Sequence, residues 1–196
     1  MSRLRPPQQV KLVMSLLFSV EEDLAAVLER VDRRFGPIDF LSEPFPFDFT
    51  TYYEREMGKN LLRRMTGFRP LISPDDLVSV KAWTDEEERK NLQSQGGRRV
   101  NIDPGYLAPS KFILATGKDY SHRIYLGEGV YGDLALLYQN GKFTPLPWTY
   151  PDYGSNPLME VLRLIRKRYL WQLKNPAPRP SASGEGKGDS DLEGVF

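Results

Sequence analysis

The residues best suited to chemistry gather in one short segment around His122, the only histidine in the chain. Lys118, Asp119 and Arg123 stand close to it. Three of these side chains can carry positive charge, and an arginine can hold a phosphate or carboxylate through two parallel hydrogen bonds. His122 could also exchange a proton with a ligand, because histidine titrates near neutral pH. The pattern predicts a site for an anionic ligand, the alternative being a solvent-exposed turn that His122 caps.

Asp103 is the second candidate, in the run Asn101-Ile102-Asp103-Pro104-Gly105-Tyr106. The run predicts a strand that ends in a Pro-Gly turn, a place that suits a metal ligand or a general base. Glu56 and Glu43 could join Asp103 around a hard cation such as Mg²⁺ or Mn²⁺. The alternative is an aspartate that accepts a hydrogen bond from its own turn, as Asp-Pro-Gly sequences often do.

Aromatic residues in two further segments could stack on a nucleobase or a sugar. They are Tyr52, and Trp148 and Tyr150 in the loop 148–153. The alternative is that these rings only cover the end of the sheet. The remaining residues predicted to line the ligand are Asn101, Tyr106, Tyr125 and Asp152. We expect these segments to meet in one concave face, with His122 held by Asp103 or Asp152.

Several common sites are excluded by what the sequence lacks. It has no phosphate-binding Walker loop, no Rossmann glycine pattern, no His-Glu-x-x-His and no Gly-x-Ser-x-Gly. Cysteine is absent, which excludes disulfides, thiolate metal sites and a cysteine nucleophile. A single histidine also excludes a metal site built from several histidines of one chain.

Length and composition favour one soluble domain with a tail. The 196 residues are 40% apolar and 27% charged, with a net charge of +1 that favours neither a nucleic-acid coat protein nor a strongly acidic partner. We expect a single α+β domain at 1–174, in which helices flank a largely antiparallel mixed sheet. Residues 175–196 are rich in Pro, Ser, Gly and charge, which predicts a disordered tail.

The first half of the chain alternates strand and helix patterns. The apolar run 10–18 is preceded by basic residues, but no signal-peptide cleavage site follows and it is too short to cross a bilayer, so it predicts a buried strand. A capping-box pattern at 19–22 starts a helix that Gly36-Pro37 ends. Strands are expected near 39–45, at 52–57 and up to Leu71.

The second half predicts two helices and a series of hairpin strands. A short helix begins at Ser73-Pro74, and a second capping box at Thr84 predicts a separate, mostly solvated helix from Asp85 to about Gln95. Strands follow at 100–102, 112–115, 123–126, 134–138 and 142–146, the last two joined by an Asn140-Gly141 turn. A final helix begins at Asn156-Pro157 and carries a basic outer face that could contact nucleic acid or only solvent.

Five blocks taken together resemble a prokaryotic family known as a domain of unknown function, DUF4416. They are 42–50, 52–58, 101–106, 118–127 and the Trp148-Thr149-Tyr150-Pro151-Asp152-Tyr153 loop. The resemblance spans about 10–173 and implies a bacterial or archaeal cytoplasmic protein. It brings no activity or catalytic residues with it.

Two functions are open at this point. The first is a metal-dependent phosphoester or nucleotide hydrolase, in which Asp103 and Glu56 hold the cation, Lys118 and Arg123 stabilise the anion, and His122 donates a proton. The second is a noncatalytic module that binds a nucleotide or an RNA end and needs no metal. Both take a phosphate-bearing partner and neither involves a membrane, whereas the sequence leaves the oligomeric state open.

Overall fold

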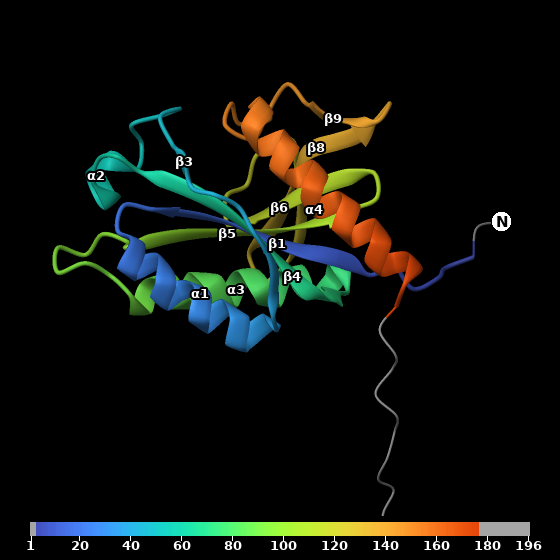
Figure 1. Ribbon diagram of the computed structural model, residues 1–196, viewed down its shortest axis with the longest axis horizontal. Helices are drawn as coiled ribbons and strands as arrows, with labels where there is room; N and C mark the ends of the chain where they lie inside the picture. Colours follow the sequence, from blue (N-terminus) through green and yellow to red (C-terminus); the bar gives the residue numbers. More distant parts are fainter. Residues whose placement is uncertain (1–2, 177–196) are drawn as a thin grey trace, which may run out of the picture.

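A nine-stranded antiparallel sheet with helices on both faces forms the protein (Figure 1), in a computed structural model that describes residues 3–176. The strands are β1 Val10–Phe18, β2 Ile38–Leu41, β3 Phe45–Pro46, β4 Leu62–Ile72, β5 Val100–Ala108, β6 Lys111–Thr116, β7 Arg123–Gly127, β8 Val130–Gln139 and β9 Lys142–Pro145. The helices are α1 Glu21–Phe35, α2 Glu54–Met57, α3 Leu77–Lys90 and α4 Asn156–Lys174. The expected α+β class and antiparallel sheet are confirmed. The predicted tail lies, from residue 177 on, outside the described residues.

Strand β1 is the centre of the sheet, and every one of its residues is buried. It pairs with β4 on one side and β5 on the other, in the order β2-β4-β1-β5-β6-β8-β7. The short strand β3 adds to β4, and β9 adds to β8. Asn140 and Gly141, both with positive φ, make the predicted tight turn between β8 and β9.

Helices α1 and α3 cover one face of the sheet. Leu24, Val27 and Val31 of α1 and Val80 of α3 pack against Leu12, Met14, Leu16 and Phe18 of β1. The predicted start of α1 is confirmed, although Val20 takes the N-cap position without a side-chain hydrogen bond. The predicted end is also confirmed, since Gly36 adopts a φ of 89°.

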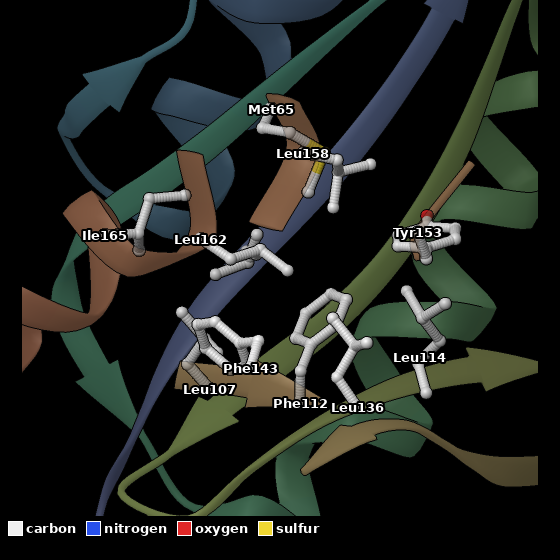
Figure 2. Close-up of a cluster of buried hydrophobic side chains, with 12 residues drawn as sticks. Met65, Leu107, Phe112, Leu114, Leu136, Phe143, Tyr153, Leu158, Leu162 and Ile165 are labelled. Atoms are coloured by element: carbon white, nitrogen blue, oxygen red, sulfur yellow. The ribbon is translucent and has the colours of Figure 1, made fainter. Parts of the chain in front are cut away.

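Helix α4 covers the opposite face, called here the α4 face. Figure 2 shows Leu158, Leu162 and Ile165 of α4 in one cluster with Met65, Leu107 and Phe112 of the sheet. This cluster also contains Tyr153, from the loop that leads into α4. Leu158, Leu162 and Ile165 form an apolar stripe along α4, and their burial packs α4 against the sheet. The loop 146–155, which leads into α4, is thereby held close to the sheet.

The expected turn at Pro104-Gly105 is wrong, because β5 runs straight through it. The N–H of Ile102 bonds to the Glu88 side chain and not to a strand, since β6 pairs with β5 only from Gly105 on. Pro104, two residues further along β5, has its ring nitrogen on the same side. No neighbouring strand pairs with β5 there, so the missing N–H of proline costs no hydrogen bond between strands. A Cβ at Gly105 would lie 2.4 Å from the Ile113 carbonyl oxygen, so glycine is required there by the close approach of β6.

The predicted helix break at Thr84 is also wrong. Residues 77–90 form one continuous helix that ends before Gln95. The Thr84 hydroxyl donates to the Lys81 carbonyl, 2.9 Å away, instead of capping a new helix. Thr84, Glu87 and Glu88 are buried rather than solvated, because α3 lies along β5.

The strand predicted at 52–57 is a turn followed by the short helix α2. Met57 is buried with Leu17, Phe47 and Leu61. It was expected to lie on one face of a strand, and it reaches the core from one turn of helix instead. The correction matters for the site, because a helical turn places Tyr53 and Glu56 on neighbouring positions of one surface.

A fully buried lysine ties β1 to β2 and α4. The Lys11 ammonium donates to both carboxylate oxygens of Asp39, at 2.8 and 2.7 Å, and to Gln172 Oε1 at 2.8 Å. Burial lowers the pKa of Lys11, against the opposing effect of Asp39. The charge is tolerated inside the protein because these acceptors replace water.

We therefore expect Asp39→Ala to destabilise the protein by about 3–5 kcal/mol, since it leaves the Lys11 charge buried without a counterion. Urea unfolding followed by circular dichroism measures the change. Asp48→Ala, at an exposed aspartate, is the control and should change stability by less than about 0.5 kcal/mol. An Asp39→Ala midpoint equal to the wild-type midpoint would contradict this account of Lys11.

Candidate functional site

Polar side chains replace apolar ones at one end of the α4 face. Ser15 pairs with Met65 and with Asp103, while Leu17 pairs with Arg63 and with Asn101. Directly paired residues point to the same face of a sheet. Ser15, Arg63, Asn101 and Asp103 therefore share the face that α4 covers further along.

Arg98, just before β5, connects this polar end to helix α2. Its Nε and Nη2 donate side-on to the two oxygens of Glu56, at 2.6 and 2.7 Å. Its Nη1 donates to Asn101 Oδ1, and Asn101 Nδ2 donates to Asp103 Oδ2 at 2.7 Å. The hydrogen bonds from Arg98 lower the pKa of Glu56. One chain of hydrogen bonds thus runs from α2 to Asp103.

Arg98 also reaches the opposite face through Glu88 of α3. Arg98 Nη1 lies 3.3 Å from Glu88 Oε2, and the other Glu88 oxygen accepts the N–H of Ile102. Burial raises the pKa of Glu88 to about 7, although the Ile102 bond and the Arg98 charge act in the other direction. Glu88 therefore titrates near neutral pH.

Arg63 is buried at the centre of the polar end, with its side chain 3% exposed. Its Nη1 pairs with Asp152, and its guanidinium lies 4.7 Å from the ring centre of Phe47 and 5.0 Å from that of Tyr153. Burial alone would lower the pKa of Arg63, but nearby acidic groups that include Asp152 and Asp103 raise it. The group stays charged, and one carboxylate and two rings fix its position.

His122 and Arg123 belong to a second cluster, around Asp133 of β8. Arg123 Nε donates to Asp133 Oδ2 at 2.9 Å, and His122 Nε2 lies 3.5 Å from the same oxygen. Arg123 also donates to the Tyr150 hydroxyl at 3.3 Å. The carboxylate beside His122 is therefore Asp133, and neither Asp103 nor Asp152 as the sequence suggested.

Aromatic rings surround this second cluster. The His122 ring stacks on Trp148, with ring centres 5.2 Å apart and an angle of 16° between planes. Tyr120 lies beside both His122 and the Arg123 guanidinium. Trp148 is itself fixed, because its indole N–H donates to the Leu134 carbonyl at 2.9 Å. These contacts hold the rings in place before any ligand arrives.

Tyr52 and Tyr53 join the two clusters. The Lys118 ammonium lies 5.2 Å from the ring centre of Tyr52, which stands 5.0 Å from the ring of Tyr53. Tyr53 in turn lies near Phe47 and Arg98. Burial, and next the charge of Asp103, raise the pKa of Tyr53. The segments 52–56, 98–103, 118–123 and 148–153 thus form one connected surface.

A family model described as a domain of unknown function (DUF4416) matches residues 8–169. The chain belongs to this family. No curated protein and no solved structure matches it. Among residues 3–176, no helix of the DUF4416 chain is both long and apolar enough to cross a membrane.

Most of the predicted site residues of this DUF4416 chain are brought together. Those in the connected surface are Asn101, Asp103, Lys118, His122, Arg123, Tyr52, Glu56, Trp148, Tyr150 and Asp152. Tyr106 lies elsewhere, on the opposite sheet face beside Leu77. Glu43 is almost fully exposed and its nearest cation is Arg64, 3.9 Å away. Tyr125 contacts Tyr131 at the far end of β7.

The carboxylates proposed for a metal are already engaged or apart. Both oxygens of Glu56 bind Arg98, and Asp103 accepts a bond from Asn101. Within residues 3–176, no three His, Asp or Glu side chains are grouped closely enough to hold a metal ion. A hollow lined by Asp23, Arg30, Glu87, Glu88 and Arg99 lies instead on the α1 and α3 side of the sheet.

Sequence reasoning missed Arg63, Arg98 and Asp133. Arg63 is a buried arginine in β4 and Asp133 a buried aspartate in the largely apolar strand β8, and a charged residue within a strand is the one signal that could have found them. Arg98 lies in a loop rich in glycine and polar residues, where nothing local distinguishes it. Arg63 and Arg98 have partners far away in the sequence, Asp152 and Glu56, whereas the partner of Asp133 is Arg123, ten residues before it.

The raised pKa of Glu88 predicts a stability that depends on pH. The folded protein holds the Glu88 proton up to about pH 7, whereas an ordinary glutamate loses it near 4.5. This contribution is complete below pH 4.5 and is lost as pH rises through about 7, with an upper bound of about 3 kcal/mol. We expect Glu88→Gln to remove most of that decline in urea unfolding between pH 5 and 8.

The matched control is Glu86→Gln, on the exposed side of the same helix, where Glu86 pairs with Lys90. It should keep the wild-type decline. If Glu88→Gln and wild type lose stability equally over that range, Glu88 does not titrate as the structure indicates.

Proposed function

We propose that this protein binds a small phosphate-bearing ligand with an aromatic ring, of which a nucleotide is the representative class. The observation that carries the proposal is the position of Lys118. Its ammonium lies over the exposed ring of Tyr52 and has no carboxylate within 4 Å among residues 3–176. A cation held by a ring and left without a counterion suits a phosphate group.

The neighbouring rings supply surfaces for a base. Tyr52 is 63% exposed and Tyr150 is 51% exposed, while Trp148 presents part of its ring beside His122. Stacking on such rings contributes about 1–3 kcal/mol per base and tolerates any base. The ring positions are set by contacts with Tyr53, Arg123 and Leu134, so little ordering is needed on binding.

Arg123 has a positioning role rather than a free charge. Its Nε is bound to Asp133 and its Nη1 to the Lys118 carbonyl oxygen, at 2.9 Å each. These bonds fix the segment that carries Lys118 to the end of β7. A ligand phosphate would therefore meet Lys118 first, with Arg123 and His122 behind it.

The hydrolase hypothesis has less support than binding. What favours it is the place of His122, whose Nε2 lies 3.5 Å from the buried Asp133 carboxylate and has no hydrogen-bond partner among residues 3–176. What weakens it is the engagement of Glu56 by Arg98 and the distant place of Glu43. A cation would have to be held by Asp103, the ligand phosphates and water, the way Mg²⁺ is often bound.

RNA is the other partner of the proposed class. The outer face of α4 carries Arg163, Lys167, Arg168 and Lys174, and a strand passing from Lys118 toward α4 would meet this charge. We propose a cytoplasmic location, where nucleotides and RNA are available as ligands.

The proposal predicts a tryptophan fluorescence change when adenosine and guanosine mono- and triphosphates are titrated at low salt, because Trp148 lies at the site. Lys118→Ala should weaken binding about tenfold, the effect of one hydrogen bond to a charged group. Tyr52→Ala should weaken it by a similar factor through lost stacking.

Lys142→Ala, at an exposed lysine of the β8–β9 hairpin, is the control and should bind as wild type does. Fluorescence that stays constant for all four nucleotides and for a short single-stranded RNA would exclude the proposed function. Release of phosphate from the triphosphates with Mg²⁺ or Mn²⁺ present would favour the hydrolase over the noncatalytic binding protein.

A further inference from the structure

We propose that Arg63, Ser15 and Tyr153 form a second, buried site that binds an oxyanion, the carboxylate or phosphoryl group of a small molecule. It lies on the α4 face, beside Phe47 and Asp152, and requires neither Lys118 nor a stacking base. It therefore goes beyond the nucleotide surface and can be tested separately from it.

Three buried hydrogen-bond donors meet in this place without acceptors. Ser15 Oγ, Arg63 Nε and the Tyr153 hydroxyl have no well-aligned hydrogen-bond partner among residues 3–176. All three residues are at most 4% exposed. An unpaired polar group inside a protein costs about 1–3 kcal/mol, so buried donors are normally satisfied. Three of them from different elements indicate that something outside the chain accepts their hydrogen bonds.

The donors are close to one another. The Ser15 hydroxyl lies close enough to that of Tyr153 for a hydrogen bond between them to lower the pKa of Tyr153, although burial raises that pKa more strongly. Such a bond uses only one of the two hydroxyl protons, so the other proton and the Arg63 Nε–H remain free to donate. The Arg63 guanidinium lies 5.0 Å from the Tyr153 ring centre. Ser15 and Arg63 face the same side of β1 and β4, in adjacent rows of the sheet.

The free edge of Arg63 is the one that binds carboxylates side-on. Asp152 occupies Nη1, which leaves the edge formed by Nε and Nη2. Arg98 uses this same edge to hold both oxygens of Glu56 at 2.6 and 2.7 Å. Two parallel bonds of this kind favour carboxylate and phosphate over other groups. Phe47 and Tyr153 fix the plane of the Arg63 guanidinium, so the edge is preorganised.

The negative charge of Asp103 weakens the binding of an anion at this site. It pairs with Ser15 across β5 and β1, and its charge acts on both Arg63 and Tyr153. A second anion beside Asp103 is repelled, so the site should bind weakly while Asp103 is ionised. Asp103→Asn keeps an oxygen to accept the Asn101 hydrogen bond and removes the charge. It should therefore bind an oxyanion about five- to tenfold more tightly.

A buried structural water is the competing explanation, because a water could accept from the same donors. The two explanations differ in what the hydroxyls do for the free protein. A structural water makes the Ser15 and Tyr153 hydroxyls stabilising, so their removal would lower stability. A ligand site leaves them unsatisfied in the free protein, so Ser15→Ala and Tyr153→Phe should leave the urea midpoint unchanged or raise it.

The experiment is equilibrium dialysis of the full chain with labelled inorganic phosphate and labelled acetate, in potassium chloride at constant ionic strength. Wild type should show saturable binding of at least one of the two. Arg63→Lys, Ser15→Ala and Tyr153→Phe should each weaken it about three- to tenfold, and Asp103→Asn should strengthen it. Ser15→Ala should keep the wild-type change in tryptophan fluorescence on titration with nucleotides, which separates this site from the nucleotide surface.

Tyr169→Phe is the matched control, because the Tyr169 hydroxyl has a partner, the Gln9 carbonyl at 2.7 Å. It should lower the urea midpoint and leave anion binding unchanged. The proposal is overturned if neither anion binds wild type or Asp103→Asn, or if Ser15→Ala and Tyr153→Phe bind as wild type does. If those two variants lose stability and wild type binds neither anion, a buried structural water accepts the hydrogen bonds of these donors.

Discussion

Arg63 is kept inside the protein by one carboxylate and two aromatic rings, and the polar end of the α4 face is arranged around it. Asp152, which supplies that carboxylate, lies in the loop that leads into α4, so the ion pair connects β4 to this loop. A buried charge that loses its partner costs about 3–5 kcal/mol, which gives the loop one strongly preferred position. Trp148, Tyr150 and Tyr153 take their places from that position. The aromatic surface therefore depends on a buried ion pair.

Arg98 performs a comparable role at the edge of the same region, where the two faces of the sheet communicate. It contacts Glu56 of α2, Glu88 of α3 and Asn101 of β5. A change in the charge of Glu88 near neutral pH would therefore act on the residue that aligns Asn101 and Asp103. Close packing supports the arrangement, since a Cβ at Gly97 would lie 2.1 Å from the Glu56 carbonyl oxygen. The loop before β5 can only approach α2 this closely with glycine at that position.

The sequence predicted helices, strands and turns correctly where they depend only on residues close together in the chain. The apolar run of β1, the Gly36 end of α1 and the Asn140-Gly141 hairpin depend on neighbouring residues, and all are confirmed. The turn predicted at Pro104-Gly105 was wrong because a Pro-Gly pair can also lie within a strand. Which of the two occurs depends on where β6 begins to pair with β5, and local sequence does not show this. The segments of the candidate site could be selected from the sequence because polar and aromatic residues cluster in them. Their partners, Asp133 for His122 and Arg63 for Asp152, were missed because strand pairing and loop packing choose them.

The central claim is that the Nε–H of Arg63 is buried, rigid and free to donate to an oxyanion. Its ¹H–¹⁵N resonance, assigned in the full chain by comparison with Arg63→Lys, tests this most directly. We predict a slowly exchanging Arg63 signal that shifts downfield and saturates on addition of phosphate or acetate. The Nε–H signal of Arg98, already bonded to Glu56, should stay in place. An Arg63 signal that exchanges rapidly with water, or that does not move at saturating phosphate and acetate, would contradict the account.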